Sequence, residues 1–152
     1  MTNNLFPIQE NENIFPILDM EKKIGYRSGI NFDFQISGSQ QIIVQKIQDI
    51  DGIASWENWC KICLATERYE HLAYSSDFGI ETKEAFLADT KEKAESILTR
   101  QIKEALKADP YGRTDYVEDV SFLWATPDSV QVTVIVHGIN QVTITISEKI
   151  RR

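Results

Sequence analysis

Alternating apolar and polar positions predict antiparallel strands near both ends of the sequence. Phe32, Phe34 and Ile36 alternate with polar residues, and a second short run at 41–45 follows a Ser-Gly-Ser turn. From 117 to 147 three further runs alternate in the same way, with turn residues between them. We therefore expect a hairpin in the first part of the chain and an antiparallel meander at its C-terminal end.

Two stretches with apolar residues at three- and four-residue spacing predict helices. The first follows Asp51-Gly52 and ends near Thr66. The second starts at an N-cap in Asp89-Thr90 and stops before Asp109-Pro110, because proline disfavours helical geometry in the preceding residue. Its expected inner face consists of Ala94, Ile97, Leu98, Gln101, Ile102, Ala105 and Leu106. The predicted fold is therefore α+β: a single domain with antiparallel β-meander and hairpins packed against two main helices.

The first 23 residues are predicted to form an extended arm in front of a domain at 24–152. Two clusters, Leu5-Phe6-Pro7-Ile8 and Ile14-Phe15-Pro16-Ile17, repeat a Phe-Pro-Ile anchor, and each proline favours extended geometry for the residue before it. Fully stretched, about twenty residues reach on the order of 65 Å. Phe6 and Phe15 are candidate anchors in surface pockets of a neighbouring subunit. The alternative is an arm that folds back on its own domain.

Composition narrows the class of partner. The chain has 152 residues, of which 42% are hydrophobic, and this size suits one domain with a single core. Its net charge of −7 would repel a polyanion on average, so nucleic acid is not an expected partner. No apolar stretch approaches the roughly 20 residues that cross a bilayer, so no membrane is expected either.

Residues that could carry catalysis or hold a metal are few. His71 and His137 have no further ligand types near them at metal spacing, and Cys60 and Cys63 both fall on the apolar stripe of the first helix. We expect core thiols, no metal and no cofactor. Four carboxylates in the central loop could in principle supply the acid and base of a glycoside hydrolase. They are Glu67, Glu70, Asp77 and Glu81.

One stretch resembles a known family. Residues 60–81, CKICLATERYEHLAYSSDFGIE, combine a helix ending in leucine and Thr-Glu-Arg-Tyr with an aromatic step and then Asp-Phe-Gly-Ile-Glu. This pattern resembles the signature of baseplate proteins from PBSX-type prophages. It is also similar to the sheath-initiator (baseplate wedge) family of phage T4, whose relatives occur in tailocins and type VI secretion baseplates. The likeness extends over roughly 32–147 and includes the Asp-Pro corner before Arg113.

The resemblance implies a structural protein without a catalytic site, present in several copies in a symmetric assembly, with six-fold symmetry expected, in the baseplate of a contractile tail or tailocin. It would be made in the bacterial host cytoplasm. Its partners would be the tail sheath subunit, baseplate wedge proteins and inner tube or hub proteins. The domain would dock on the wedge and present β-structure that the first sheath ring extends with its own terminal strands. The competing interpretation is a tail-associated peptidoglycan hydrolase that uses the loop carboxylates.

The residues expected to bind partners fall into three groups besides the arm. Glu67 and Arg68 are expected to reach beyond the domain. Arg113 is expected to form a bidentate ion pair or to bind carbonyl groups of a neighbour, unless the segment 109–112 is simply a turn. The C-terminal hairpin has few lysines or prolines to protect its edge, so it is the expected acceptor of an added strand. Its acceptor residues would be Val130, Val132, Val134, Val142, Ile144 and Ile146.

The motif also contains residues with an expected structural role. The sequence Asp-Phe-Gly is typical of a turn that seats Phe78 in the core while Gly79 takes a positive φ. The full set is Tyr69, Asp77, Phe78, Gly79, Asp109 and Pro110.

Overall fold

The computed structural model describes residues 25–36 and 42–151. The elements in chain order are β1 (Gly29–Ile36), β2 (Ile42–Ile50), α1 (Gly52–Ala65), α2 (Lys83–Phe86), α3 (Lys91–Lys107), β3 (Thr114–Thr126), β4 (Ser129–Gly138), η1 (Ile139–Gln141) and β5 (Thr143–Arg151). All strand pairs between these elements are antiparallel. The predicted α+β fold class is confirmed.

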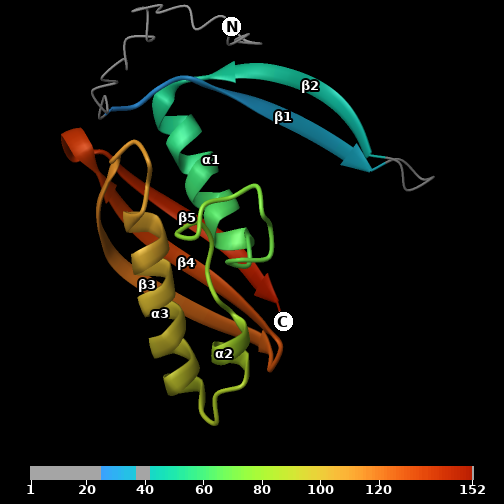
Figure 1. Ribbon diagram of the computed structural model, residues 1–152, viewed down its shortest axis with the longest axis vertical. Coiled ribbons are helices and arrows are strands. Elements are labelled where there is room, and N and C mark those ends of the chain that lie inside the picture. Colours follow the sequence, from blue (N-terminus) through green and yellow to red (C-terminus); the bar gives the residue numbers. More distant parts are fainter. Residues whose placement is uncertain (1–24, 37–41, 152) are drawn as a thin grey trace, which may run out of the picture.

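The strands β3, β4 and β5 form one sheet, with β4 in the middle, and the helices α1 and α3 cover one face of it (Figure 1). α1 packs on β5, and α3 packs on β3. Alternate residues of β4 from Val130 to Val136 point into this helix-covered face and are fully buried. Because side chains of a strand alternate between its two faces, the period-two pattern was a reliable sign of this layer.

The two main helices begin where short polar side chains satisfy their free amides. Asp51 caps α1, since its Oδ1 accepts a hydrogen bond from the Ala54 amide at 2.8 Å. Thr90 caps α3 in the same way through the Lys93 amide at 3.3 Å. The predicted inner face of α3 is confirmed: its members are buried except for Ile97, which is partly buried against the core.

The first two strands form a separate sheet of their own, the β1–β2 ribbon, which extends away from the helices (Figure 1). The register shifts between Asp33 and Phe34, where a β-bulge interrupts the pairing. The ribbon touches the body at its base, where Asn58 Nδ2 donates to Asn31 Oδ1 at 3.3 Å. The side chains of Ile30 and Ile47 are 58% and 62% exposed. The ribbon therefore stands apart from the main core and carries apolar surface.

The first described residues contact the connection between β4 and β5. Tyr26 donates its hydroxyl hydrogen bond to the Ile139 carbonyl at 2.9 Å, and its ring lies 5.5 Å from that of Trp56. Gly138 leaves room for this contact, because a Cβ there would lie 2.6 Å from the Trp56 ring. Burial raises the pKa of the Tyr26 hydroxyl above its ordinary value. Among the described helices, none has the length and apolar character to span a membrane.

Candidate interaction surfaces

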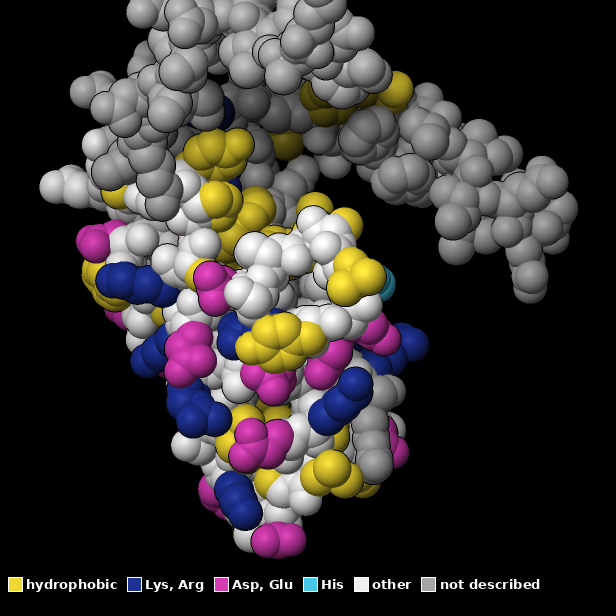
Figure 2. All heavy atoms as spheres, viewed as in Figure 1, with side chains coloured by type: hydrophobic (Ala, Val, Ile, Leu, Met, Phe, Trp, Pro, Cys, Tyr) yellow, Lys and Arg dark blue, Asp and Glu magenta, His cyan; other side chains and the backbone are white. Residues whose placement is uncertain are grey.

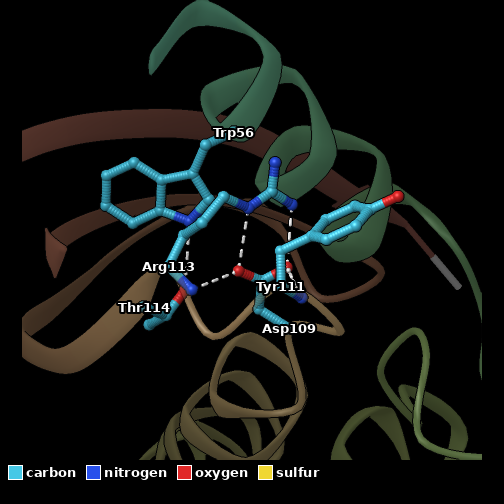
Figure 3. A network of polar contacts seen from close by, with 5 residues as sticks. All are labelled: Trp56, Asp109, Tyr111, Arg113 and Thr114. Carbon is cyan, nitrogen blue, oxygen red and sulfur yellow. Dashed lines mark hydrogen bonds and ion pairs between the residues drawn. The ribbon is translucent and has the colours of Figure 1, made fainter. Parts of the chain in front are cut away.

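The corner after α3 is built around a buried ion pair. Asp109 and Arg113 face each other through two short contacts, from Arg113 Nε to Asp109 Oδ2 at 2.9 Å and from Nη2 to Oδ1 at 2.7 Å (Figure 3). The Arg113 amide also donates to Oδ2 at 2.7 Å, and the Tyr111 amide donates to Oδ1 at 3.4 Å. The two side chains are only 3% and 0% exposed. The carboxylate thus holds the turn and the arginine together.

Aromatic rings enclose this pair. The Arg113 guanidinium carbon lies 5.7 Å from the Trp59 ring centroid and 5.0 Å from that of Tyr111. Next to it, Trp56 Nε1 donates to Thr114 Oγ1 at 3.1 Å (Figure 3). The expected bidentate ion pair therefore exists, but both partners belong to this chain. Arg113 is a core residue here, and its guanidinium is not presented to a neighbour as the sequence led us to expect.

The corner also contains the expected turn. The Gly112 amide donates to the Asp109 carbonyl at 3.0 Å, which closes a turn over Pro110, and Gly112 has a φ of 60°. Pro110 itself is exposed. The expected turn is therefore present, and it brings Arg113 back onto the Asp109 carboxylate inside the domain.

The base of the central loop uses the polar groups of Glu67 and Arg68. The Glu67 carboxylate accepts hydrogen bonds from the Thr82 hydroxyl and from the Thr82 amide, the latter at 3.1 Å to Oε2. Arg68 Nε donates to the Gly79 carbonyl at 3.0 Å, and its side chain is 10% exposed. Both side chains join the two ends of the loop. Their polar groups are thus engaged inside the domain, and the expected contact beyond it stays a prediction.

Backbone pairing fixes the same base. The Arg68 amide donates to the Ile80 carbonyl, and the Ile80 amide donates to the Thr66 carbonyl, both at 3.0 Å. Gly79 has a φ of 89°, and a Cβ there would lie 2.7 Å from the Thr66 carbonyl oxygen. Phe78 packs against Trp59 at 5.8 Å between ring centroids. Gly79 takes the expected positive φ, and Phe78 is partly buried and packs against the core.

The exposed part of the central loop, which we call the tip, contains Tyr69 and Leu72. The sequence predicted a structural role for Tyr69 and singled out neither side chain as a contact. Tyr69 is 67% exposed and has a positive φ of 67°, and Leu72 is completely exposed. A non-glycine residue at positive φ stores strain, and such strain is common at functional sites. The signal available in the sequence was the presence of several large apolar side chains in an irregular segment.

An apolar pocket of about 300 Å³ lies beside this tip. We call it the aromatic pocket; its lining is Trp59, Ile62, Ala73, Tyr74, Ser75, Phe78, Ala108 and Pro110. Ile62 and Tyr74 are 50% and 47% exposed. In Figure 2 hydrophobic side chains gather in the upper half of the face, next to the central loop, whereas mixed charged side chains cover the lower half over α3. The pocket itself is lined mainly by apolar and aromatic side chains.

The strand edges differ from the expectation for the C-terminal hairpin. β4 pairs with β3 on one side and β5 on the other, so its backbone has no open edge. Val130, Val132 and Val134 are fully buried and cannot receive a strand; this part of the prediction is wrong. Ile144 and Ile146 are also core residues, and Val142 packs against the core. Of the predicted hairpin, only β5 has an open backbone edge; the other edge strand of this sheet is β3.

The histidines and cysteines have ordinary surroundings. His137 Nε2 lies 2.6 Å from Glu118 Oε2, its Nδ1 lies 3.0 Å from Thr143 Oγ1, and Tyr116 stacks on its ring. Cys60 and Cys63 are free, buried thiols, as expected, and burial raises the pKa of both. Within 25–36 and 42–151 no group of three or more possible ligands could hold a metal ion.

The loop carboxylates gain no support as catalytic groups. Glu67 is engaged with Thr82, as described above. Glu81 Oε1 lies 3.9 Å from Arg68 Nη1. Asp77 is exposed to solvent. Phe6 and Phe15, the remaining expected contacts, lie outside the described residues.

The β1–β2 ribbon, the central loop and the corner after α3 all fall within one segment that matches a known family. No curated protein matches the sequence significantly. A family described as "Contractile injection system sheath initiator" matches residues 29–141, which is well over half of the chain. The matched segment runs from β1 to the end of η1 and includes the Asp109–Arg113 pair. This chain therefore belongs to the sheath initiator family of contractile injection systems.

Proposed function

We propose that this structural protein docks on the baseplate wedge and templates the first sheath ring by accepting strands at the edges of the β1–β2 ribbon. Membership of the sheath initiator family carries the general role in a contractile tail. The observation that carries the specific role is the ribbon itself: it is a two-stranded sheet separate from the core, with Ile30 and Ile47 exposed.

The β1–β2 ribbon has only two strands, which is an unfavourable number for a stable sheet. An isolated hairpin is marginally stable in water, and three or more strands with a buried apolar face are usually needed. In the described part of the chain, β1 pairs only with β2, so each strand has one open edge. Addition of one strand from a sheath subunit at either edge would complete hydrogen bonding and cover apolar side chains at once.

The energetics favour a ring over a single contact. β1 has eight residues, so an added antiparallel strand would make about eight backbone hydrogen bonds, or roughly 4–12 kcal/mol at 0.5–1.5 each. Ordering eight residues costs roughly 8–16 kcal/mol at 1–2 per residue. One strand alone therefore falls short by roughly 4 kcal/mol at the midpoints of these two ranges. Burial of side chains and the presence of several copies in one ring must supply the difference.

The edge of β5 is the second possible acceptor, as the sequence suggested. It differs from the ribbon because β5 belongs to a three-stranded sheet whose inner face is already covered by α1. A further strand would therefore stabilise the three-stranded sheet less than it would stabilise the ribbon. The exposed tip at Tyr69 and Leu72 is the surface that we assign to docking on the wedge, since Glu67 and Arg68 are used inside the domain.

Hydrogen exchange of the full chain, alone and assembled with the sheath subunit, tests this proposal. We expect peptides from β1 and β2 to exchange at least about tenfold more slowly after assembly, which corresponds to about 1.4 kcal/mol of protection. Protection of β5 with an unchanged ribbon would move the acceptor to β5. Unchanged exchange in all three strands would refute strand addition.

A matched pair of variants separates the ribbon from general surface effects. Ile47→Lys places a charge on the ribbon, whereas Leu123→Lys does the same on β3, where the side chain is 73% exposed. Both variants should keep the melting temperature of the parent, because both side chains are solvated. Only Ile47→Lys should impair sheath assembly; equal impairment by both would contradict the proposal.

A further inference from the structure

We infer that the second Phe-Pro-Ile anchor of the arm, Ile14–Ile17, binds in the aromatic pocket of the same copy. This inference concerns a site other than the ribbon and stands independently of the proposed templating role. It rests on the chemistry of the pocket, on where the described chain begins, and on the repeated anchor in the sequence.

The pocket has the chemistry that such an anchor requires. Tyr74 and Phe78 lie 4.5 Å apart between ring centroids, Trp59 meets Phe78 at a steep angle, and Pro110 adds a further flat apolar surface. Aromatic-lined grooves bind extended proline-containing segments, because the fixed φ of proline lowers the entropy lost on binding. A volume of about 300 Å³ equals that of on the order of ten water molecules, enough for apolar side chains of one anchor.

The pocket leaves apolar side chains exposed to water, which is unfavourable for the protein. Ile62 lies on α1 with half of its surface in water, and Tyr74 is exposed to a similar degree. Covering these side chains removes apolar area from water, which is favourable in proportion to the area covered. Since Phe78 and Trp59 are fixed from below by the core, the site is largely preformed.

The chain enters the fold close to this pocket. The Arg27 guanidinium lies 5.1 Å from the Tyr111 ring centroid, and the neighbouring Pro110 lines the pocket. Gly25, the first described residue, comes eight positions after Ile17, and eight extended positions span up to about 26–29 Å. The second anchor can therefore reach its own pocket.

The length of the connection decides between the two anchors. Phe6 lies nine residues further from the fold than Phe15, although both belong to the same Phe-Pro-Ile sequence. The entropy cost of closing a loop rises with its length, so the nearer anchor has the advantage when the chemistry is equal. The same argument favours the arm's own copy over a neighbour in dilute solution.

Nuclear Overhauser contacts in the full 17.4 kDa chain test the inference directly. We expect contacts from the methyl groups of Ile14 and Ile17 to the rings of Trp59 and Phe78, unchanged on dilution. Contacts from Ile8 in their place, contacts found only between differently labelled copies, or random-coil methyl shifts for both anchors would each overturn the inference.

Matched variants link the contacts to the pocket. Phe15→Ala and Ile62→Lys should each lower the bound population about tenfold or more, since each removes or opposes burial of a large apolar side chain. Phe6→Ala and Ile53→Lys are the controls; Ile53 is 41% exposed on the same helix but does not line the pocket. The shifts of the buried β4 valines should stay unchanged in all four variants, which shows that the fold is intact. Equal effects of test and control variants would contradict the inference.

Discussion

Removing the charge of Arg113 should destabilise the whole domain. Arg113→Met leaves the Asp109 carboxylate in a site where that side chain is 0% exposed, without its two guanidinium contacts. Loss of one partner of a buried ion pair costs about 3–5 kcal/mol. For a chain of this size each kcal/mol lowers the melting temperature by about 2–4 °C, so the expected decrease is roughly 6–20 °C.

Urea unfolding followed by tryptophan fluorescence measures this loss, because Trp59 lies against the guanidinium and Trp56 lies in the same network. Arg100→Met is the matched control: Arg100 is 60% exposed and lies 4.0 Å from Glu84, so about 0.5 kcal/mol or less is expected. Replacing Asp109 by Leu together with Arg113→Met should recover part of the loss. If Arg113→Met lowered the unfolding free energy by less than about 1 kcal/mol, the structural role of Arg113 would be refuted. The prediction that Arg113 binds a partner would then stand again.

Three further predictions concern the loop and the thiols. Glu67→Gln should lower the unfolding free energy by about 1–3 kcal/mol in calorimetry, whereas the exposed Glu70→Gln should change little; equal effects would contradict the role of Glu67 at the loop base. Gly79→Ala should cost about 1–3 kcal/mol, because its φ is 89° and the new Cβ meets a backbone oxygen; a neutral result would show that the loop can shift. The folded pKa of Cys60 is raised above the ordinary 9.0, so both states are protonated below pH 9 and only the unfolded thiol ionises above it. The unfolding free energy should therefore fall above pH 9, by up to about 1.4 kcal/mol per pH unit from this thiol, and Cys60→Ala should reduce that slope.

Local patterns in the sequence predicted the elements well because their causes are local. The apolar stripe of α3, the cap at Thr90 and the alternation of β4 each depend on residues within a few positions of one another. The buried state of the two thiols followed from their place on the stripe of α1 in the same way. Gly79 was predictable because the turn around it demands a positive φ.

The interaction sites were harder to predict because their outcome depends on distant parts of the chain. Whether β4 has an open edge is decided by its pairing with both β3 and β5, and alternation alone says nothing about position in a sheet. A charged residue such as Glu67 is expected at the surface, but its carboxylate accepts hydrogen bonds from Thr82, fifteen residues further along the chain. The resemblance suggested a bidentate ion pair for Arg113, and the structure contains one. That its partner is Asp109 of the same chain, buried in the core, could not be seen from the sequence.

A cryo-EM map of the assembled baseplate with its first sheath ring would test the central claim most directly. We predict a strand from a sheath subunit paired along the outer edge of β1 or β2, so that it extends the antiparallel ribbon. A ribbon with no foreign strand beside it in the assembled particle would contradict the account.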